Sequence, residues 1–162
     1  MYERIDVFQD SDEYYYIDFI PYEANDVKFL ELEEYFERTY IRSFAKKITR
    51  IVLKMIYRYP CEIISTESAI PVKLKYEMPF YEDIRNSTPD KLAYFINKII
   101  TKDFSSMQIL FSEPQFLFSI NGGFGVAVYQ PTDEVLQILK MLIGQEGLFL
   151  KYKNSEDERT LV

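Results

Sequence analysis

The fold class follows from residues 107–129, which read MQILFSEPQFLFSINGGFGVAVY. Three runs rich in β-branched and aromatic residues lie here, Met107–Ser112, Phe116–Ile120 and Phe124–Tyr129, with turn residues between them. Such runs are typical of antiparallel strands, because branched and aromatic side chains pack well on a pleated surface. Asn121-Gly122 separates the last two runs, and since both residues accept a positive φ, we expect a tight hairpin there.

On both sides of these residues, runs of the same composition predict further short strands. They are Glu3–Gln9, Glu13–Ile20, Cys61–Ser65, Val72–Glu77 and Gly147–Tyr152. We expect the first two to form a hairpin across the turn at residues 10–12, because short polar side chains cap their own backbone there. In Val72–Glu77 lysines alternate with apolar residues, a pattern that suits an exposed or edge strand.

Three helices are predicted from apolar spacing. One runs from about Glu34 to Tyr59, where apolar residues recur at steps of three and four. A second runs from Thr88, as N-cap, to about Lys102, and a third covers Asp133–Ile143, with Gly144 expected as a left-handed C-terminal cap. Residues 27–32 fit a strand or the start of a helix equally well.

Together these elements predict an α+β fold. We expect a mostly antiparallel sheet of six to eight short strands, covered by one long amphipathic helix and two shorter helices. The 162 residues suit one domain, placed at residues 1–153, with residues 154–162 as a frayed C-terminal tail.

The residue types restrict the chemistry. There is no histidine and one cysteine, Cys61, which excludes Ser-His and Cys-His catalytic pairs and a structural zinc site. We therefore expect a protein that is not an enzyme and binds no cofactor or metal. The single cysteine fits a reducing compartment, and no signal peptide or membrane span is apparent, so we expect a cytoplasmic protein.

The charges are segregated along the chain. Residues 1–37 hold twelve acids and two bases, whereas residues 38–58 hold seven bases and no acid. The whole chain carries a net charge of −7 and has a pI near 4.8. Such segregation indicates electrostatic partners, inside or outside the molecule.

Residues 1–37, the acidic arm, contain the candidate partner-binding residues. Acidic groups steer an encounter with a basic partner, and tyrosines supply contact area at a low entropic cost. The alternative is a plain solvated surface, since net negative charge keeps proteins in solution. The candidates are Asp10, Asp12, Glu13, Tyr14, Tyr16 and Asp18.

Residues 38–58, the basic stretch, contain three candidates for contacts with an anion. They are Arg42, Lys46 and Arg50. A basic helical stripe is typical of phosphate contacts, but the acidic pI argues against a nucleic-acid partner. The alternative is a solvated helix face whose bases pair with the acidic N-terminal hairpin.

Two groups of acidic residues have some features of metal sites. Asp10, Asp12 and Asp18 are suitable ligand types for Ca²⁺ or Mg²⁺, but the glycine and closing glutamate of a calcium loop are missing. Asp18 with Asp26-Val27-Lys28 loosely fits a metal-dependent nuclease, an interpretation that the acidic surroundings oppose.

In type, the chain resembles the small acidic immunity proteins of bacterial polymorphic and contact-dependent toxin systems. The resemblance lies in size, acidity, tyrosine content and antiparallel runs such as residues 116–126, FLFSINGGFGV, and it includes no specific motif. It implies a non-enzymatic inhibitor that masks the active site of a basic toxin domain with an acidic, tyrosine-rich surface. The alternatives are a scaffold domain with internally paired charges and a carboxylate-dependent or Mg²⁺-dependent enzyme.

Overall fold

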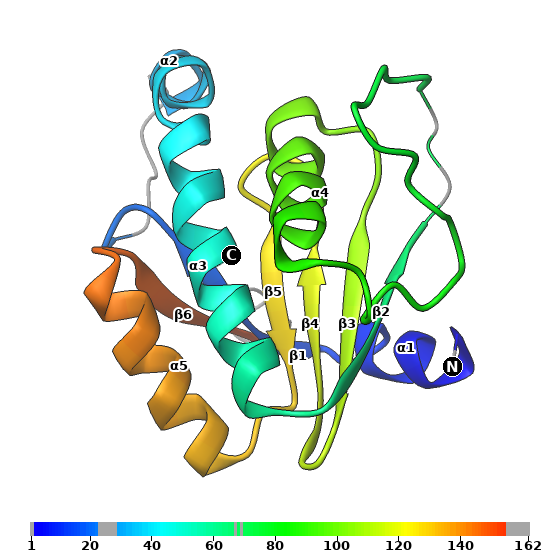
Figure 1. Cartoon of the computed structure of the whole chain (residues 1–162). Coiled ribbons are helices and arrows are strands. Elements are labelled where there is room, and N and C mark those ends of the chain that lie inside the picture. Colours follow the sequence, from blue (N-terminus) through cyan, green and yellow to red (C-terminus); the bar gives the residue numbers. More distant parts are fainter. Residues whose placement is uncertain (1, 23–28, 67, 69, 155–162) are drawn as a thin grey trace.

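The fold was obtained as a computed structural model, which describes residues 2–22, 29–66, 68 and 70–154 (Figure 1). Within these residues the chain forms five helices and six strands. The helices are α1 (Tyr2–Gln9), α2 (Phe29–Thr39), α3 (Ile41–Arg58), α4 (Pro89–Lys102) and α5 (Asp133–Gln145). The strands are β1 (Glu13–Asp18), β2 (Cys61–Ser65), β3 (Met107–Ser112), β4 (Gln115–Ile120), β5 (Val126–Tyr129) and β6 (Phe149–Asn154).

The six strands make one antiparallel sheet in the order β2-β3-β4-β5-β1-β6. The predicted meander β3-β4-β5 forms its centre, and the N-terminal strand β1 lies between β5 and β6. The α+β class and the antiparallel sheet are therefore confirmed, while the helices differ from the predicted set of one long and two short.

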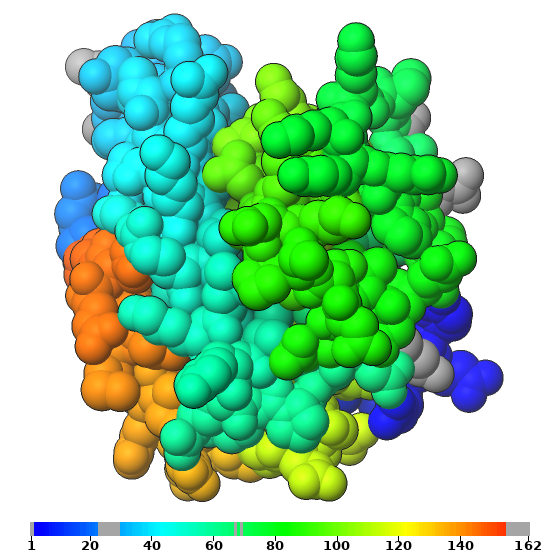
Figure 2. All heavy atoms as spheres, in the orientation of Figure 1, coloured from blue at the N-terminus to red at the C-terminus, as the bar shows by residue number. Residues whose placement is uncertain are grey.

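Helices α3, α4 and α5 cover one face of the sheet, which we call the helix face (Figure 1). The main core lies beneath them, because each helix turns an apolar stripe toward alternate residues of the strands. Figure 2 shows the side chains of this layer closing over the sheet. Its largest fully buried members include Phe44, Phe95, Phe111, Phe116 and Phe118.

The second face of the sheet is covered by α1 over only one half. Ile5 and Phe8 of this helix pack on Ile64, Leu110 and Leu117, which belong to β2, β3 and β4. In the half of this face made by β5, β1 and β6, Tyr129 of β5 packs against that cluster, and α1 does not cover the rest. This half forms the floor of the site described below.

The prediction of a strand at Glu3–Gln9, and of a hairpin with the next strand, is wrong. The segment is helix α1, and the residues that it buries, Ile5 and Phe8, are three positions apart, which matches a helical face. A strand would have buried Ile5 and Val7 together, but Val7 is 69% exposed.

Val72–Glu77 was predicted as a strand and is not one. Its alternation is real, since Val72, Leu74 and Tyr76 pack against the core while the lysines between them are exposed. The segment lies on α4 instead of in the sheet. The Lys75 N–H donates to the Tyr94 hydroxyl at 2.7 Å, and the rings of Tyr76 and Tyr94 meet at 5.2 Å.

The predicted long helix is interrupted. Helices α2 and α3 are separated at Tyr40, whose φ of −113° departs from helical geometry. Phe29–Thr39 is helical, which settles the described part of the open segment at residues 27–32; residues 27 and 28 lie outside the described residues.

The prediction of Gly144 as a left-handed cap is wrong. Gly144 lies inside α5, and Gly147 takes the left-handed conformation, with φ of +70°. The predicted hairpin of β4 and β5 is confirmed, but its turn spans residues 121–125 instead of two residues, and Gly123 has a positive φ, +64°. Gly122 is required there because a Cβ would lie 1.6 Å from Oδ1 of Asp103.

Candidate functional site

The open half of the second face forms an aromatic groove of about 820 Å³. Its floor comes from the period-two alternation of β1, which places Tyr14, Tyr16 and Asp18 on this face and Ile17 in the main core. Tyr16 lies opposite Ala127 of β5 on one side and Lys151 of β6 on the other. Tyr129, at the end of β5, completes the floor.

The floor tyrosines contact one another. The rings of Tyr14 and Tyr129 have centroids 5.5 Å apart, and those of Tyr14 and Tyr16 are 6.4 Å apart. Burial, followed by the neighbouring Tyr14, raises the pKa of the Tyr129 hydroxyl above its ordinary value. The Tyr129 hydroxyl therefore stays protonated near neutral pH and can both donate and accept hydrogen bonds.

One end of the groove is a wall of phenylalanines from three separate segments. Phe19 follows β1, Phe36 belongs to α2, and Phe124 belongs to the turn before β5. The Phe19 ring lies 5.0 Å from Phe36 and 4.6 Å from Phe124, measured between centroids. This end is apolar and is built by tertiary packing, because no two of the three residues are neighbours in the sequence.

Asp18, a predicted partner-binding acid, is already paired inside the groove. Lys151 Nζ lies 2.8 Å from Asp18 Oδ2 and donates a second hydrogen bond, of 2.9 Å, to the carbonyl of Tyr22. The same ammonium lies 6.0 Å from the centroid of the Tyr16 ring. Asp18 therefore holds Lys151 in place and contributes little net charge to a partner.

The other three predicted acids lie together at the start of β1. Asp10, Asp12 and Glu13 are exposed there, and Glu13 accepts a hydrogen bond of 3.2 Å from the Asn154 amide. At the opposite end, Glu33 of α2 lines the groove. Three more exposed acids on that helix are Glu31, Glu34 and Glu37.

The sequence therefore identified part of this site. Tyr14 and Tyr16 line the groove with Asp18, and the three exposed acids lie beyond its end. Sequence reasoning missed Phe19, Phe36, Phe124 and Tyr129. The alternation of β1 could have separated the groove-facing tyrosines from the others, but no local signal places α2 or the β4–β5 turn beside them.

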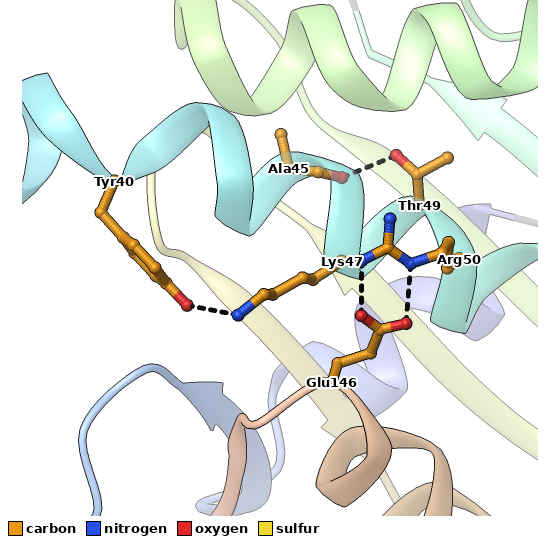
Figure 3. A network of polar contacts seen from close by, with 6 residues as sticks. All are labelled: Tyr40, Ala45, Lys47, Thr49, Arg50 and Glu146. Atoms are coloured by element: carbon orange, nitrogen blue, oxygen red, sulfur yellow. Dashed lines mark hydrogen bonds and ion pairs between the residues drawn. The ribbon is translucent and has the colours of Figure 1, made fainter.

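The basic residues of α3 belong to the opposite side of the sheet. Arg50 forms a two-pronged ion pair with Glu146, at 2.7 and 2.6 Å, and this pair lowers the pKa of the Glu146 carboxyl (Figure 3). Lys47 donates to the Tyr40 hydroxyl at 2.9 Å. Arg42 and Lys46 are exposed, and neither forms an ion pair within the described ranges.

This arrangement contradicts the proposed folding of an acidic hairpin over the basic helix. The N-terminal segment forms α1 and the strand β1 next to the sheet edge, and its described ion pairs are Arg4 with Glu62, at 3.5 Å, and Asp18 with Lys151. Arg50 is paired, but with an acid that follows α5. The sheet lies between α1 and the basic helix, because the two pack on opposite faces.

The groups available for metal or nucleophilic chemistry are few. Among the described residues no three acids or cysteines come together as metal ligands, and Asp26-Val27-Lys28 lies outside those residues. Burial raises the pKa of the Cys61 thiol to about 11, which keeps it protonated and unreactive. The groove offers aromatic surface, hydroxyls, the carboxylates of Asp18 and Glu33 and the ammonium groups of Lys151 and Lys153, which suit recognition of another molecule.

None of the helices in the described parts of the chain combines the length and apolar character that a membrane span requires. No protein-family model, curated protein or solved structure matches this chain.

Proposed function

We propose that the chain is a non-enzymatic protein-binding protein, and that the aromatic groove is its docking site for a basic partner. The observation that supports this most is the composition of the groove, which has tyrosines on its floor and the half-buried Glu33 at one end. The exposed acids Asp10, Asp12 and Glu13 lie beyond the other end, and the lining also includes Lys151, paired with Asp18, and Lys153. Tyrosine is enriched in the energetically important parts of protein interfaces, and charged rims set the rate and specificity of encounter.

The biological role that fits this partner best is immunity to a toxin, in the cytoplasm of a bacterial cell. A basic toxin domain that acts on nucleic acid carries cationic residues around its active site. Asp10, Asp12 and Glu13 would bind those cations in place of phosphates, while Tyr14 and Tyr16 supply the contact area. The inhibitor would then need no catalytic group, in agreement with the absence of histidine.

A scaffold function with internally paired charges has less support. Arg42 and Lys46 are exposed on the helix face, away from Asp10, Asp12 and Glu13. A metal-dependent enzyme that uses carboxylates would require converging acids, and no group of three possible metal ligands comes together among the described residues.

The test is a comparison of baits in affinity capture from the source cell, followed by measurement of Kd with the purified pair. The first variant, Asp10→Asn with Asp12→Asn and Glu13→Gln, removes three exposed acids near the groove. The control, Glu77→Gln with Glu82→Gln and Glu113→Gln, removes three exposed acids elsewhere and so makes the same change in net charge.

We expect the first variant to weaken binding of the captured protein by about tenfold and to reduce its dependence on salt, because rim charges act through screened attraction. The control should bind like the unaltered chain. Equal weakening by both variants would show that net charge, and not this site, governs the interaction. Binding unaffected by either would reject the groove's acidic end as the docking site.

A further inference from the structure

The two edges of the sheet differ in how their backbone groups are satisfied. At β2 the loop at residues 81–84 closes the edge. Ile63 exchanges bonds with it, donating to Asp83 Oδ1 at 2.9 Å and accepting from the Ile84 N–H at 2.8 Å. The Tyr81 N–H donates to the Ser65 carbonyl at 2.8 Å.

Within the described residues, the β6 edge is unpaired over residues 149–152. There β1 is the only strand that pairs with β6, and no backbone bond joins these four residues to a described loop. An unpaired edge presents a row of backbone donors and acceptors to another strand. Natural proteins cover such an edge, as this one does at β2, or place lysines on it; β6 carries Lys151, whose ammonium is held by Asp18 and the Tyr22 carbonyl, and Lys153.

This unpaired edge borders the aromatic groove. Lys151 points into the groove, so Phe149, two residues away, lies on the same face, whereas Leu150 and Tyr152 lie on the other. A strand added to β6 would continue this alternation. Every second side chain of that strand would face the groove, next to Tyr16 and Lys151.

The charges define the chemistry of the added strand. Because β1 and β6 are antiparallel, Phe149 lies beside Asp18 and Asn154 lies beside Glu13, so β6 runs from the phenylalanine end of the groove to the acidic start of β1. Asp10 and Asp12 lie at the acidic end, near the start of β1, and Glu33 lines the phenylalanine end. Six residues of strand cover about 20 Å, so a strand of that length reaches both ends.

We propose that the partner binds by adding an extended segment to β6, as a seventh strand of the sheet. The segment pairs with residues 149–152, directs apolar side chains toward the groove and carries lysine or arginine at both ends. This inference rests on the proposed function, which makes the groove a docking site. It adds how the partner would bind there. Strand addition draws affinity from backbone bonds and specificity from alternate side chains.

The probe for this mode is the synthetic peptide Lys-Lys-Val-Thr-Phe-Thr-Val-Lys-Lys with blocked ends. Two further versions carry N-methyl groups, one on the backbone nitrogens of the threonines and the other on those of the central apolar residues. In an added strand only alternate N–H groups face β6. One methylated version should therefore bind at least about tenfold more weakly, because it loses interstrand bonds, and the other should bind like the parent.

A second test measures the amide hydrogen exchange of the full chain with and without the parent peptide. Protection should increase at alternate amides within residues 149–152, while β2, whose edge is closed, serves as the internal control. Equal binding of both methylated peptides, protection at β2 instead of β6, or no binding of the parent peptide would each overturn strand addition. The capture experiment above does not use these peptides. If the captured protein binds in a way that depends on Asp10, Asp12 and Glu13 but the peptides show no strand pairing, the proposed function stands and strand addition is rejected.

Discussion

Gly144 and Gly147 differ in what their backbones allow, although they are three residues apart. Gly144 is helical, and a methyl group there would meet open space, whereas Gly147 has a φ of +70°. We expect Gly144→Ala to raise the free energy of unfolding by about 0.8 kcal/mol, because alanine favours the helix. Gly147→Ala should lower it by about 1 kcal/mol, because a side chain strains the left-handed conformation. Urea denaturation of the two variants checks both signs; equal effects would contradict the assigned helix end.

Glu146 links α3 to the end of α5 through its two bonds to Arg50. Its pKa is lowered in the folded protein, so the carboxylate stabilises the fold above its unfolded pKa, about 4.3, and the stabilisation is lost as the pH falls through the folded value. Glu146→Gln should cost about 0.5–1 kcal/mol at pH 7 and progressively less below pH 4. Glu134→Gln, at the more exposed pair with Arg58, is the control and should change little. A cost for Glu146→Gln that is independent of pH would exclude the ion pair as its source.

At the scale of elements, helix α1 buries two apolar side chains against the sheet. Phe8, with Ile5, packs on three aliphatic residues of the sheet. We expect Phe8→Ala to destabilise the protein by about 3 kcal/mol through loss of buried area and the cavity that it leaves. Val7→Ala, at a 69% exposed position on the same helix, should stay within about 0.5 kcal/mol. Thermal unfolding distinguishes them, and similar losses in both would contradict the packing of α1 on the second face.

The sequence predicted those elements whose pattern is local. The strands at β3 and β4 and the capped helix at Thr88 carry their own signals, namely β-branched runs and an N-cap hydroxyl that accepts from the Lys91 N–H. The predictions were wrong where contacts between distant segments determine the local structure. Val72–Glu77 alternates like a strand, yet its Lys75 N–H bonds to Tyr94 instead of a ladder, and the groove wall joins Phe19 to Phe124 across more than a hundred residues.

At the scale of the whole molecule, the sheet separates two surfaces of different character. The groove lies on the second face beside exposed acids, and the basic stripe of α3 lies on the helix face. A partner that docks in the groove should therefore leave Arg42 and Lys46 untouched. We expect Arg42→Gln with Lys46→Gln to bind the captured protein as the unaltered chain does, within about twofold, since surface changes outside an interface have small effects.

Tyr16 is the residue on which the docking claim depends most, because it lies at the centre of the groove floor between Ala127 and Lys151. The most direct measurement is the Kd of the captured partner for Tyr16→Ala and for the unaltered chain, by isothermal titration calorimetry, with unfolding curves recorded to establish that the variant is folded. A folded Tyr16→Ala chain should bind at least about tenfold more weakly, as expected for a central aromatic anchor. Unchanged affinity of the folded variant, together with weakened binding by Arg42→Gln and Lys46→Gln, would place the docking surface on α3 and exclude the groove as the docking site.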